Sequence, residues 1–335
     1  MNSLNELVYL CKLVGSHFDL SQAGGGNISI KEGNNLYIKA SGLILSEVET
    51  DYGITPLSLK DGHDFTSNLL NIDEGSYGKE LERIIPKGYL RPSMESPLHL
   101  LLKKKYIIHC HPTSVLALCS SLEGKSQLSS NFPKAQWIPY CSPGLKLAQF
   151  FKQSVDLDKN IYFMQNHGLI IAHDSIEEAI HLLKQTATKC HQICNKPFNP
   201  DIFRILEFIH KKLSISTSLL QSNDHTVKTN DLSDYAPICP DDVVYLGHRI
   251  LSISDDLQRE IKEFHEHNSV LPKVIRHKQT TYIFSSNLKK CRLIEEQLRA
   301  NIIARSSYHC DLTIEKNEVD FLSNWEAEKY RAKGK

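Results

Sequence analysis

The sequence lacks an excess of charge of either sign. Lys and Arg together total 39 residues, as do Asp and Glu, so the formal net charge of the 335-residue chain is zero. A chain without a surplus of positive charge has no global field to recruit nucleic acid or an anionic membrane. We therefore expect a small-molecule ligand, and neither nucleic acid nor a membrane as a partner.

Long apolar runs are also missing. Charged residues interrupt every apolar stretch, and Met1–Leu20 has no basic segment followed by an unbroken apolar core. These absences predict that the chain has neither a transmembrane helix nor a signal peptide. The nine cysteines are odd in number and scattered through apolar segments, which is typical of reduced thiols in a reducing compartment. A cytoplasmic location is expected.

Helical and strand patterns alternate along the chain, and its length allows more than one domain. Periodicity predicts helices over 4–18, 98–105, 113–121, 145–153, 175–194, 203–213, 255–267, 287–302 and 319–330, and strands over 28–31, 36–39, 106–108, 135–140, 161–172, 242–247 and 280–284. Residues 50–86 show a poor pattern and are expected to be mostly loop. Because tight turns join several strands, we favour an α/β/α fold with a mainly antiparallel sheet over a doubly wound parallel sheet.

The stretch from Arg91 to Pro112 carries the chemistry of the first half. It places Glu95 before a short helix and a His-x-His pair, His109 and His111, at the end of an apolar strand. Side chains alternate along a strand, so both imidazoles share one face. Two imidazoles at this spacing can hold one metal ion, although such a pair also occurs in cores and on surfaces.

Two small-residue turns precede this stretch. Gly24–Asn27 is a glycine-rich turn whose backbone amides can cradle an anion, and Ala40–Gly42 adds a hydroxyl donor. A plain glycine hairpin and an ordinary loop remain open as alternatives.

Taken together, five motifs resemble the class II aldolase/adducin family, in the family's order: GGGNIS at Gly24–Ser29, ASG at Ala40–Gly42, PSxE at Pro92–Glu95, HCHP at His109–Pro112 and NHG at Asn166–Gly168. The resemblance covers roughly residues 1–200 and implies a three-layer α/β/α domain. Residues 201–234 are then expected to form a helix and linker, and residues 235–335 a smaller C-terminal α/β domain.

The resemblance also implies roles for individual residues. Carried over by motif, the metal ligands are His109, His111 and His167, which would hold Zn²⁺ or another divalent ion, and Glu95 is the catalytic acid or base. Phosphate binding falls to Gly26, Asn27, Ser41, Gly42 and Ser93. Met94 stands where the simplest family pattern has a second serine, which weakens the phosphate assignment. Tyr140 is a candidate proton donor from a neighbouring subunit, with a buried aromatic residue as the alternative.

The implied activity is that of a class II lyase. Such an enzyme cleaves a ketose 1-phosphate to dihydroxyacetone phosphate and an aldehyde through a metal-stabilised enediolate. A sugar-phosphate 4-epimerase, a methylthioribulose-phosphate-type dehydratase and a non-catalytic adducin-like module are the alternatives. The family also implies a homo-oligomer, expected to be a tetramer.

The second half suggests a repeat of the first. A strand, a turn and a helix follow one another around Asn160–Met164 and again around Thr281–Phe284. We predict that residues 235–335 are a degenerate partial copy in which Ser285–Ser286 replaces Asn166–Gly168. The alternative is the chance recurrence of a common αβ pattern.

Overall fold

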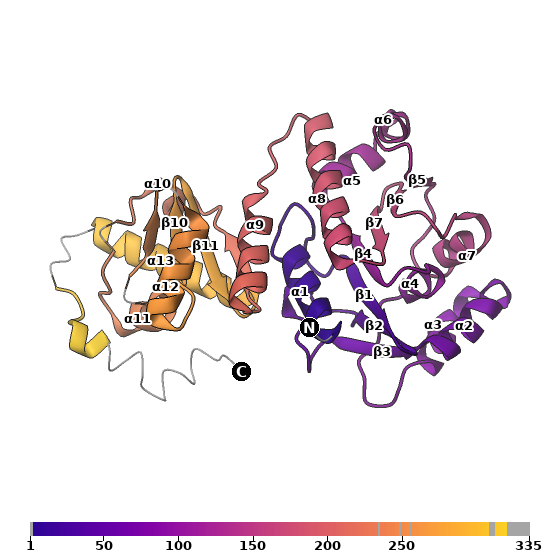
Figure 1. The fold of residues 1–335 in the computed structure, drawn as a ribbon, viewed down its shortest axis with the longest axis horizontal. Coiled ribbons are helices and arrows are strands. Elements are labelled where there is room, and N and C mark those ends of the chain that lie inside the picture. Colours follow the sequence, from indigo (N-terminus) through magenta and orange to yellow (C-terminus); the bar gives the residue numbers. More distant parts are fainter. Residues whose placement is uncertain (1–2, 234, 248, 255, 308–311, 320–335) are drawn as a thin grey trace. The chain divides into compact units, whose positions relative to one another are not determined.

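The computed structural model describes residues 3–233, 235–247, 249–254, 256–307 and 312–319. The chain divides into two compact units, Met1–Pro200 and Asp201–Lys335. Each unit contains one sheet with its own helices (Figure 1). None of the helices in these described stretches is both long enough and apolar enough to cross a membrane.

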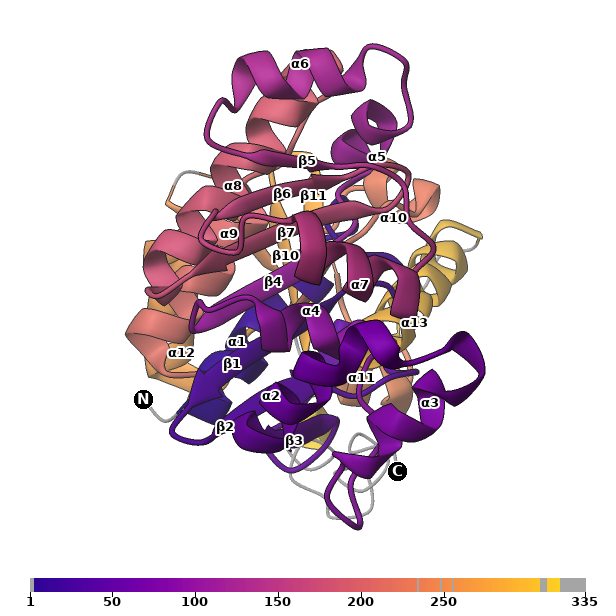
Figure 2. The same ribbon diagram turned by 90° about the vertical axis from the view of Figure 1, so that its right-hand side faces the viewer.

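The first unit is built on a seven-stranded sheet in the order β3-β2-β1-β4-β7-β6-β5 (Figure 2). Every neighbouring pair is antiparallel except β5 and β6. The strands are β1 (Asn27–Glu32), β2 (Asn35–Lys39), β3 (Ile54–Ser58), β4 (Tyr106–Cys110), β5 (Gln136–Ile138), β6 (Ile161–Met164) and β7 (Gly168–His173). The prediction of a mainly antiparallel sheet is confirmed.

Helices cover both faces of this sheet and complete three layers. On one face lie α1 (Ser3–Gly15), α5 (Thr113–Cys119), α6 (Gly124–Asn131) and α8 (Ile176–Ile193); on the other lie α2 (Leu59–Asn68), α3 (Glu74–Arg83), α4 (Ser96–Leu101) and α7 (Leu145–Ser154). The second group encloses a core in which Leu98 of α4 and Phe151 of α7 meet Ile107 of β4. The predicted three-layer class is confirmed.

Local sequence explains where several elements begin. The Ser175 hydroxyl accepts a hydrogen bond from the Glu178 amide at 3.3 Å, so Ser175 caps α8 at the start of the helix predicted over 175–194. Ile107 faces the core beside α4 and α7, and the alternation of β4 therefore turns His109 to that same face.

The prediction of loop for residues 50–86 is wrong. This stretch forms β3, α2, a 3-10 turn at Leu69–Asn71, and α3. Ser58 and Asp73 cap the two helices through their side chains, and widely spaced apolar residues such as Phe65 and Leu81 anchor them in the core. Too few apolar residues lie in each helix to produce a clear period, because only one narrow stripe is buried. The helix α6 was missed for the same reason.

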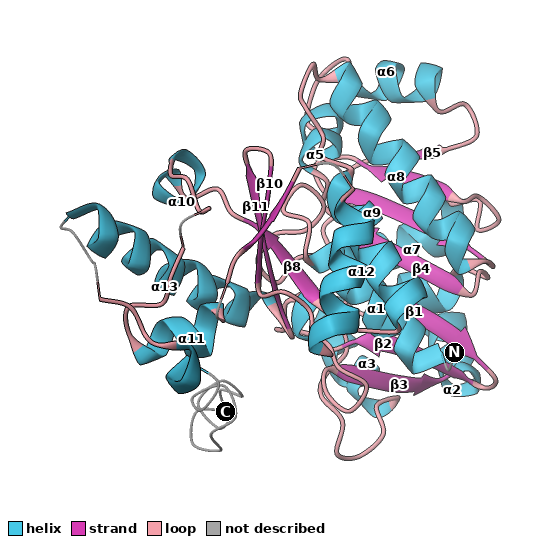
Figure 3. Cartoon of the chain, turned by 60° about the vertical axis from the view of Figure 1, so that its left-hand side comes forward, coloured by secondary structure: helices cyan, strands magenta, loops and turns pink. Residues whose placement is uncertain are grey.

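The second unit has a four-stranded sheet in the order β8-β11-β10-β9. Its strands are β8 (Ser218–Gln221), β9 (Leu251–Ile253), β10 (Val274–His277) and β11 (Thr280–Ser285). Its helices are α9 (Asp201–Phe208), a π-helical turn (Ile209–Leu213), α10 (His225–Thr229), α11 (Pro240–Leu246), α12 (Leu257–Asn268) and α13 (Leu288–Ser307). The helices α10, α11 and α13 lie on one side of the sheet (Figure 3). Their buried side chains pack into one core with Val274 and Ile283 of the sheet.

Two sequence predictions in this unit are wrong. The segment 214–233 is not simply a linker, because β8 pairs with β11 inside the sheet and α10 follows it. Of residues 242–247, predicted as a strand, all but Gly247 belong to α11. Pro240 and two acidic residues begin this helix, and the Asp242 carboxylate accepts the Ile238 amide at 2.9 Å. The helix predicted over 319–330 lies outside the described residues, apart from Val319.

The two sheets share a four-strand pattern. In β4-β7-β6-β5 and in β8-β11-β10-β9 the first two pairs are antiparallel and the last pair is parallel. By this order β11 corresponds to β7. The position in the second unit that is equivalent to His167 therefore lies in the β10–β11 turn. The prediction that Ser285–Ser286 is the counterpart of Asn166–Gly168 was wrong, because these serines lie at and after the end of β11.

Candidate metal centre

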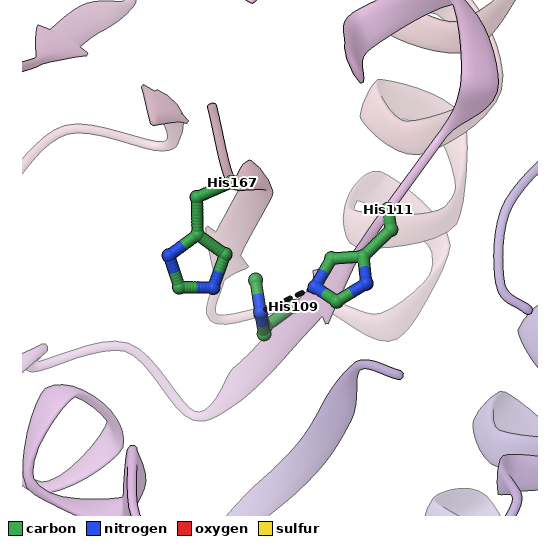
Figure 4. Close-up of side chains that lie close together, drawn as sticks. All are labelled: His109, His111 and His167. Carbon is green, nitrogen blue, oxygen red and sulfur yellow. Dashed lines mark hydrogen bonds between the residues drawn. The ribbon is translucent and has the colours of Figure 1, made fainter. Parts of the chain in front are cut away.

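Three histidines converge where the interior strand β4 ends and its neighbour β7 begins. His109 is the penultimate residue of β4, His111 follows that strand, and His167 precedes β7. The three rings point toward one another, and one nitrogen from each lies within 4.8 Å of the other two (Figure 4). The Nε2 atoms of His109 and His111 are 3.1 Å apart. Three convergent imidazole nitrogens form a donor set that a divalent transition metal accepts.

The backbone sets the protonation of His109. Its Nδ1 lies 3.0 Å from the Leu169 carbonyl, which can only accept a hydrogen bond, so Nδ1 carries the proton. The Nε2 lone pair is then directed into the cluster. A carbonyl that fixes the outer nitrogen in this way is the usual support of a metal-binding imidazole.

Burial keeps two of these rings neutral. It lowers the pKa of His109 below its ordinary value, and burial together with the neighbouring His109 lowers the pKa of His111 to about 3. A neutral imidazole is the form that binds metal. The residues present therefore fit a divalent cation.

Glu95 adds a carboxylate to the cluster. Its Oε1 lies 3.0 Å from His167 Nε2, and its Oε2 lies 3.3 Å from His109 Nε2. Burial alone would raise the pKa of Glu95, but contacts with His109, His167 and the Asn27 amide outweigh it and hold the pKa below its ordinary value. The carboxylate is therefore ionised and stands beside the nitrogens that face the metal position.

A series of buried hydrogen bonds connects Glu95 through Asn27 and His99 to Ser29. The Asn27 side-chain amide donates to Glu95 Oε2 and to Ser93 Oγ, at 3.1 Å each. The side-chain oxygen of Asn27, Oδ1, in turn contacts His99 Nε2, and His99 Nδ1 lies 2.7 Å from Ser29 Oγ. His99 was not predicted as a functional residue, although it stands four residues after Glu95 within the stretch from Arg91 to Pro112.

Glycines allow the backbone to come close to these rings. A Cβ on Gly168 would lie 2.6 Å from the Cys110 carbonyl and 2.8 Å from His111 Cδ2, and a Cβ on Gly25 would lie 2.7 Å from His111 Nδ1. Either overlap would displace His111. These two positions explain why glycine flanks the imidazole on both sides.

Only some of the residues predicted to bind phosphate lie close to one another. Ser41 is tied to the 91–93 segment, because its amide donates to the Arg91 carbonyl at 2.8 Å and Ala40 bridges to Pro92. Gly42 has φ +80 and open space beside it. Gly26 has φ +78, and a Cβ there would lie 2.7 Å from the His109 carbonyl oxygen. Asn27 and Ser93 are bonded to each other, beside Glu95.

Tyr140 is not brought to the histidines within one chain. Its side chain is 58% exposed, and its backbone amide donates to Gln165 Oε1 at 3.2 Å. Among the described residues, the Tyr140 hydroxyl makes no hydrogen bond to the cluster. The alternative of a buried aromatic residue is wrong. Met94 is also exposed, and its carbonyl accepts the Tyr77 hydroxyl.

Comparison with known proteins places this geometry in a family. A Bacillus subtilis (strain 168) protein described as the uncharacterized oxidoreductase YuxG is 26% identical over 208 residues, which are 58% of this chain and 30% of that protein. This chain therefore spans less than a third of that relative. The L-fuculose phosphate aldolase of Methanocaldococcus jannaschii is 26% identical over 157 residues, 44% of this chain and 71% of the aldolase.

A solved structure agrees with the fold of the first unit. It is the N-terminal class II aldolase domain of a conserved protein from Thermoplasma acidophilum, with a TM-score of 0.52 and 23% identity over 58% of this chain and 94% of that one. Residues 5–194 match the family model of the class II aldolase and adducin N-terminal domain. The chain belongs to the class II aldolase and adducin family.

Proposed function

We propose that the first unit is a metal-dependent aldolase that cleaves a ketose 1-phosphate to dihydroxyacetone phosphate and an aldehyde. The observation that carries this proposal is the convergence of His109, His111 and His167 with the ionised carboxylate of Glu95. The similarity to an L-fuculose phosphate aldolase supports the choice of substrate class.

The three histidines would hold Zn²⁺ or another divalent ion. When bound, such an ion supplies Lewis-acid stabilisation for the negative charge that develops on the ketose oxygens as the carbon–carbon bond breaks. The chain contributes the orientation of the ligands: the Leu169 carbonyl fixes the tautomer of His109, and Gly25 and Gly168 leave room for His111.

Glu95 would move the proton at the carbon that loses the aldehyde. Its carboxylate lies within 3.3 Å of two of the ligand nitrogens, so it is close to any substrate bound beside them. Asn27 holds one carboxylate oxygen by a hydrogen bond, and His99 fixes the orientation of the Asn27 amide. Glu95 therefore acts from a defined rotamer.

The substrate phosphate would be bound at the turns around Gly26, Asn27, Ser41, Gly42 and Ser93. The hydrogen bond between Ser41 and Arg91 brings two of these segments side by side. In the reverse, condensation direction Tyr140 would donate the proton to the aldehyde oxygen, and in cleavage the same group would take that proton back. It would act across an interface in a homo-oligomer, since its exposed side chain is available to a neighbouring subunit.

Metal analysis and a substrate panel test this proposal. We expect purified protein to contain a divalent metal and to release dihydroxyacetone phosphate from at least one ketose 1-phosphate, with loss of activity in chelator. His109→Ala and His167→Ala should lose both metal and activity, whereas Glu95→Gln should keep metal and lose turnover. His181→Ala, an exposed histidine on α8, is the matched control.

Three outcomes would contradict the proposal. Protein that contains no metal and takes none up on titration would favour an adducin-like binding module. Protein that binds metal but converts ketose phosphates without releasing dihydroxyacetone phosphate would favour an epimerase or a dehydratase. Full activity in Glu95→Gln would remove that residue from the mechanism.

A further inference from the structure

The second unit repeats the element order of the first beyond its strands. The series β4, α5, α6, β5, α7, β6, β7, α8 is matched by β8, α10, α11, β9, α12, β10, β11, α13. Strand order and strand direction agree at every pair, as described above. Two chance assemblies seldom agree in order, direction and helix placement together.

Strand register gives residue-by-residue counterparts. His109 pairs with Ile170, and Gln221 pairs with Tyr282, so a constant offset of 112 relates the two pairs. The same offset relates the first residues of α5 and α10, Thr113 and His225.

The turn before β11 is one residue shorter than the turn before β7, because two residues separate His277 from Thr280 and three separate Met164 from Gly168. Counted back from β7 and β11 at the offset of 112, Asn166 with φ 52 matches Lys278 with φ 53. By this offset, the histidines at 109, 111 and 167 are replaced by amide side chains. The replacements are Gln221, Asn223 and Gln279. The metal donor set is therefore missing from this copy.

One core position of the first unit has become polar. Phe163 of β6 is buried and lies 5.1 Å from Phe132, ring centre to ring centre, beneath α5 and α6. Its counterpart, from the pairing of β10 with β9 and β11, is Arg276, at an offset of 113 because the turn that follows β10 is one residue shorter. Beside Arg276 the second unit has a cavity of about 810 Å³. A buried apolar residue has thus been replaced by a guanidinium that lines a cavity.

Arg276 is held in place by its own unit. One guanidinium nitrogen, Nη1, donates to Thr281 Oγ1 at 2.8 Å, and the other, Nη2, donates to the Lys228 carbonyl at 2.9 Å. A guanidinium fixed by neutral acceptors keeps its full charge and needs little reordering to bind a ligand.

The cavity wall carries further positive charge. Lys228 and Lys278 line it with exposed side chains, and Asp231 is the one acid among the described lining residues. Ser252, beside Arg276 in the sheet, adds a hydroxyl. The lining thus combines three cations with one carboxylate.

Lys278 occupies a costly backbone position. A non-glycine residue in the left-handed region costs about 1 kcal/mol, less for asparagine, which the first unit uses at this turn. Folding alone therefore does not favour lysine there. Lys278 also lines the cavity.

We propose that Arg276, Lys228 and Lys278 form a binding site for a phosphate-bearing small molecule, in a second copy of the fold that has lost its metal ligands. A guanidinium presents paired donors that match phosphate oxygens, and ammonium groups add compact positive charge. The cavity volume is in the range of small-molecule sites. This site lies wholly in the second unit and does not depend on the activity proposed for the first.

The site is tested by titrating the full-length protein with phosphate in the presence of a chelator and monitoring the titration by NMR. Inorganic phosphate should shift the backbone resonances of Ser252, Arg276 and Gln279, with saturable binding. The double variant Lys228→Gln/Lys278→Gln, whose changed side chains are exposed, should weaken this binding at least tenfold. The double variant Lys262→Gln/Lys289→Gln, which removes the same charge from exposed positions on α12 and α13, should bind as the wild type does.

The variant Asn27→Ala separates this site from the one proposed in the first unit, because it changes only that unit. Resonances of the second unit should respond to phosphate in this variant as in the wild type. Shifts confined to the first unit, no saturable shift at all, or equal weakening in both lysine double variants would overturn the proposal. Arg276→Lys is a further variant, expected to bind phosphate more weakly because the fork of donors is lost.

Discussion

Ser29 Oγ lies 2.7 Å from His99 Nδ1 in the interior of the first unit, where His99 has no exposed surface. The contact joins β1 to α4 and places His99 Nε2 against the Asn27 side chain. Because the side-chain oxygen of Asn27 can only accept a hydrogen bond, His99 Nε2 carries the proton and donates to it, and the Ser29 hydroxyl donates to Nδ1. The Asn27 amide group is thereby turned toward Glu95, which connects the packing of β1 to the candidate metal centre.

His99 should make the stability of the fold depend on pH. Burial lowers its pKa from 6.5 to about 3. Between these values the unfolded chain binds the additional proton, so the free energy of unfolding should fall as pH falls from about 6.5 toward 3. One histidine contributes a slope of up to about 1.4 kcal/mol per pH unit.

Urea unfolding between pH 4 and 7, in chelator, measures this slope. His99→Gln should reduce it by close to one proton, and His181→Gln, changed at an exposed site on α8, should not. Equal slopes in wild type and His99→Gln would show that His99 is not the buried neutral group described here.

Asn27→Ala should impair turnover without removing metal. The change deletes the hydrogen bond to Glu95 Oε2 and frees the carboxylate to adopt other rotamers, while the three histidines keep their places. We expect kcat to fall roughly 10- to 100-fold, the range for a lost positioning contact in an active site. Steady-state kinetics with metal content measured on the same sample checks this. Loss of metal in proportion to activity would point to a structural role instead.

Gly25→Ala should weaken metal binding. The new methyl group would stand 2.7 Å from His111 Nδ1, and the ring would have to move out of the cluster. We expect metal affinity, measured by competition with a chelating dye, to fall at least tenfold. Gly24→Ala is the matched control, because its Cβ would meet no atom closer than 3.9 Å. Equal affinity in the two variants would contradict the tight contact at Gly25.

Asp242→Ala should destabilise the second unit. This buried carboxylate accepts the Ile238 amide at 2.9 Å, the Gln297 amide at 2.8 Å and the Asn301 amide at 2.7 Å. Removal leaves these donors without their acceptor at a cost of about 3 kcal/mol. Chemical unfolding measures the loss, with Glu296→Ala, an exposed change on α13, as control. A loss below about 1 kcal/mol would show that solvent reaches these donors.

Strongly patterned segments were predicted correctly and weakly patterned ones were not. The strand at Tyr106–Cys110 is apolar throughout, and Ser175 with Glu178 marks the start of α8, so both could be located from sequence. Residues 59–83 bury only a few side chains, and their helices form because the first unit supplies the surface that covers Phe65 and Leu81. Residues 240–246 contain two adjacent valines that suit a strand, but Pro240 and the contacts of Asp242 favour a helix.

The sequence by itself determined the donor types and the likeness to a family. The His-x-His spacing on an apolar strand places two imidazoles on one face, because strand side chains alternate. The glycine-rich turns can be recognised directly in the sequence. Only the tertiary structure decided that His167 and Glu95 join them, since β4 must pair with β7 before residues 56 positions apart can meet. The same holds for His99 beneath Asn27 and for Arg276 in the place of Phe163. These relationships depend on strand register, which long-range pairing sets and local sequence does not.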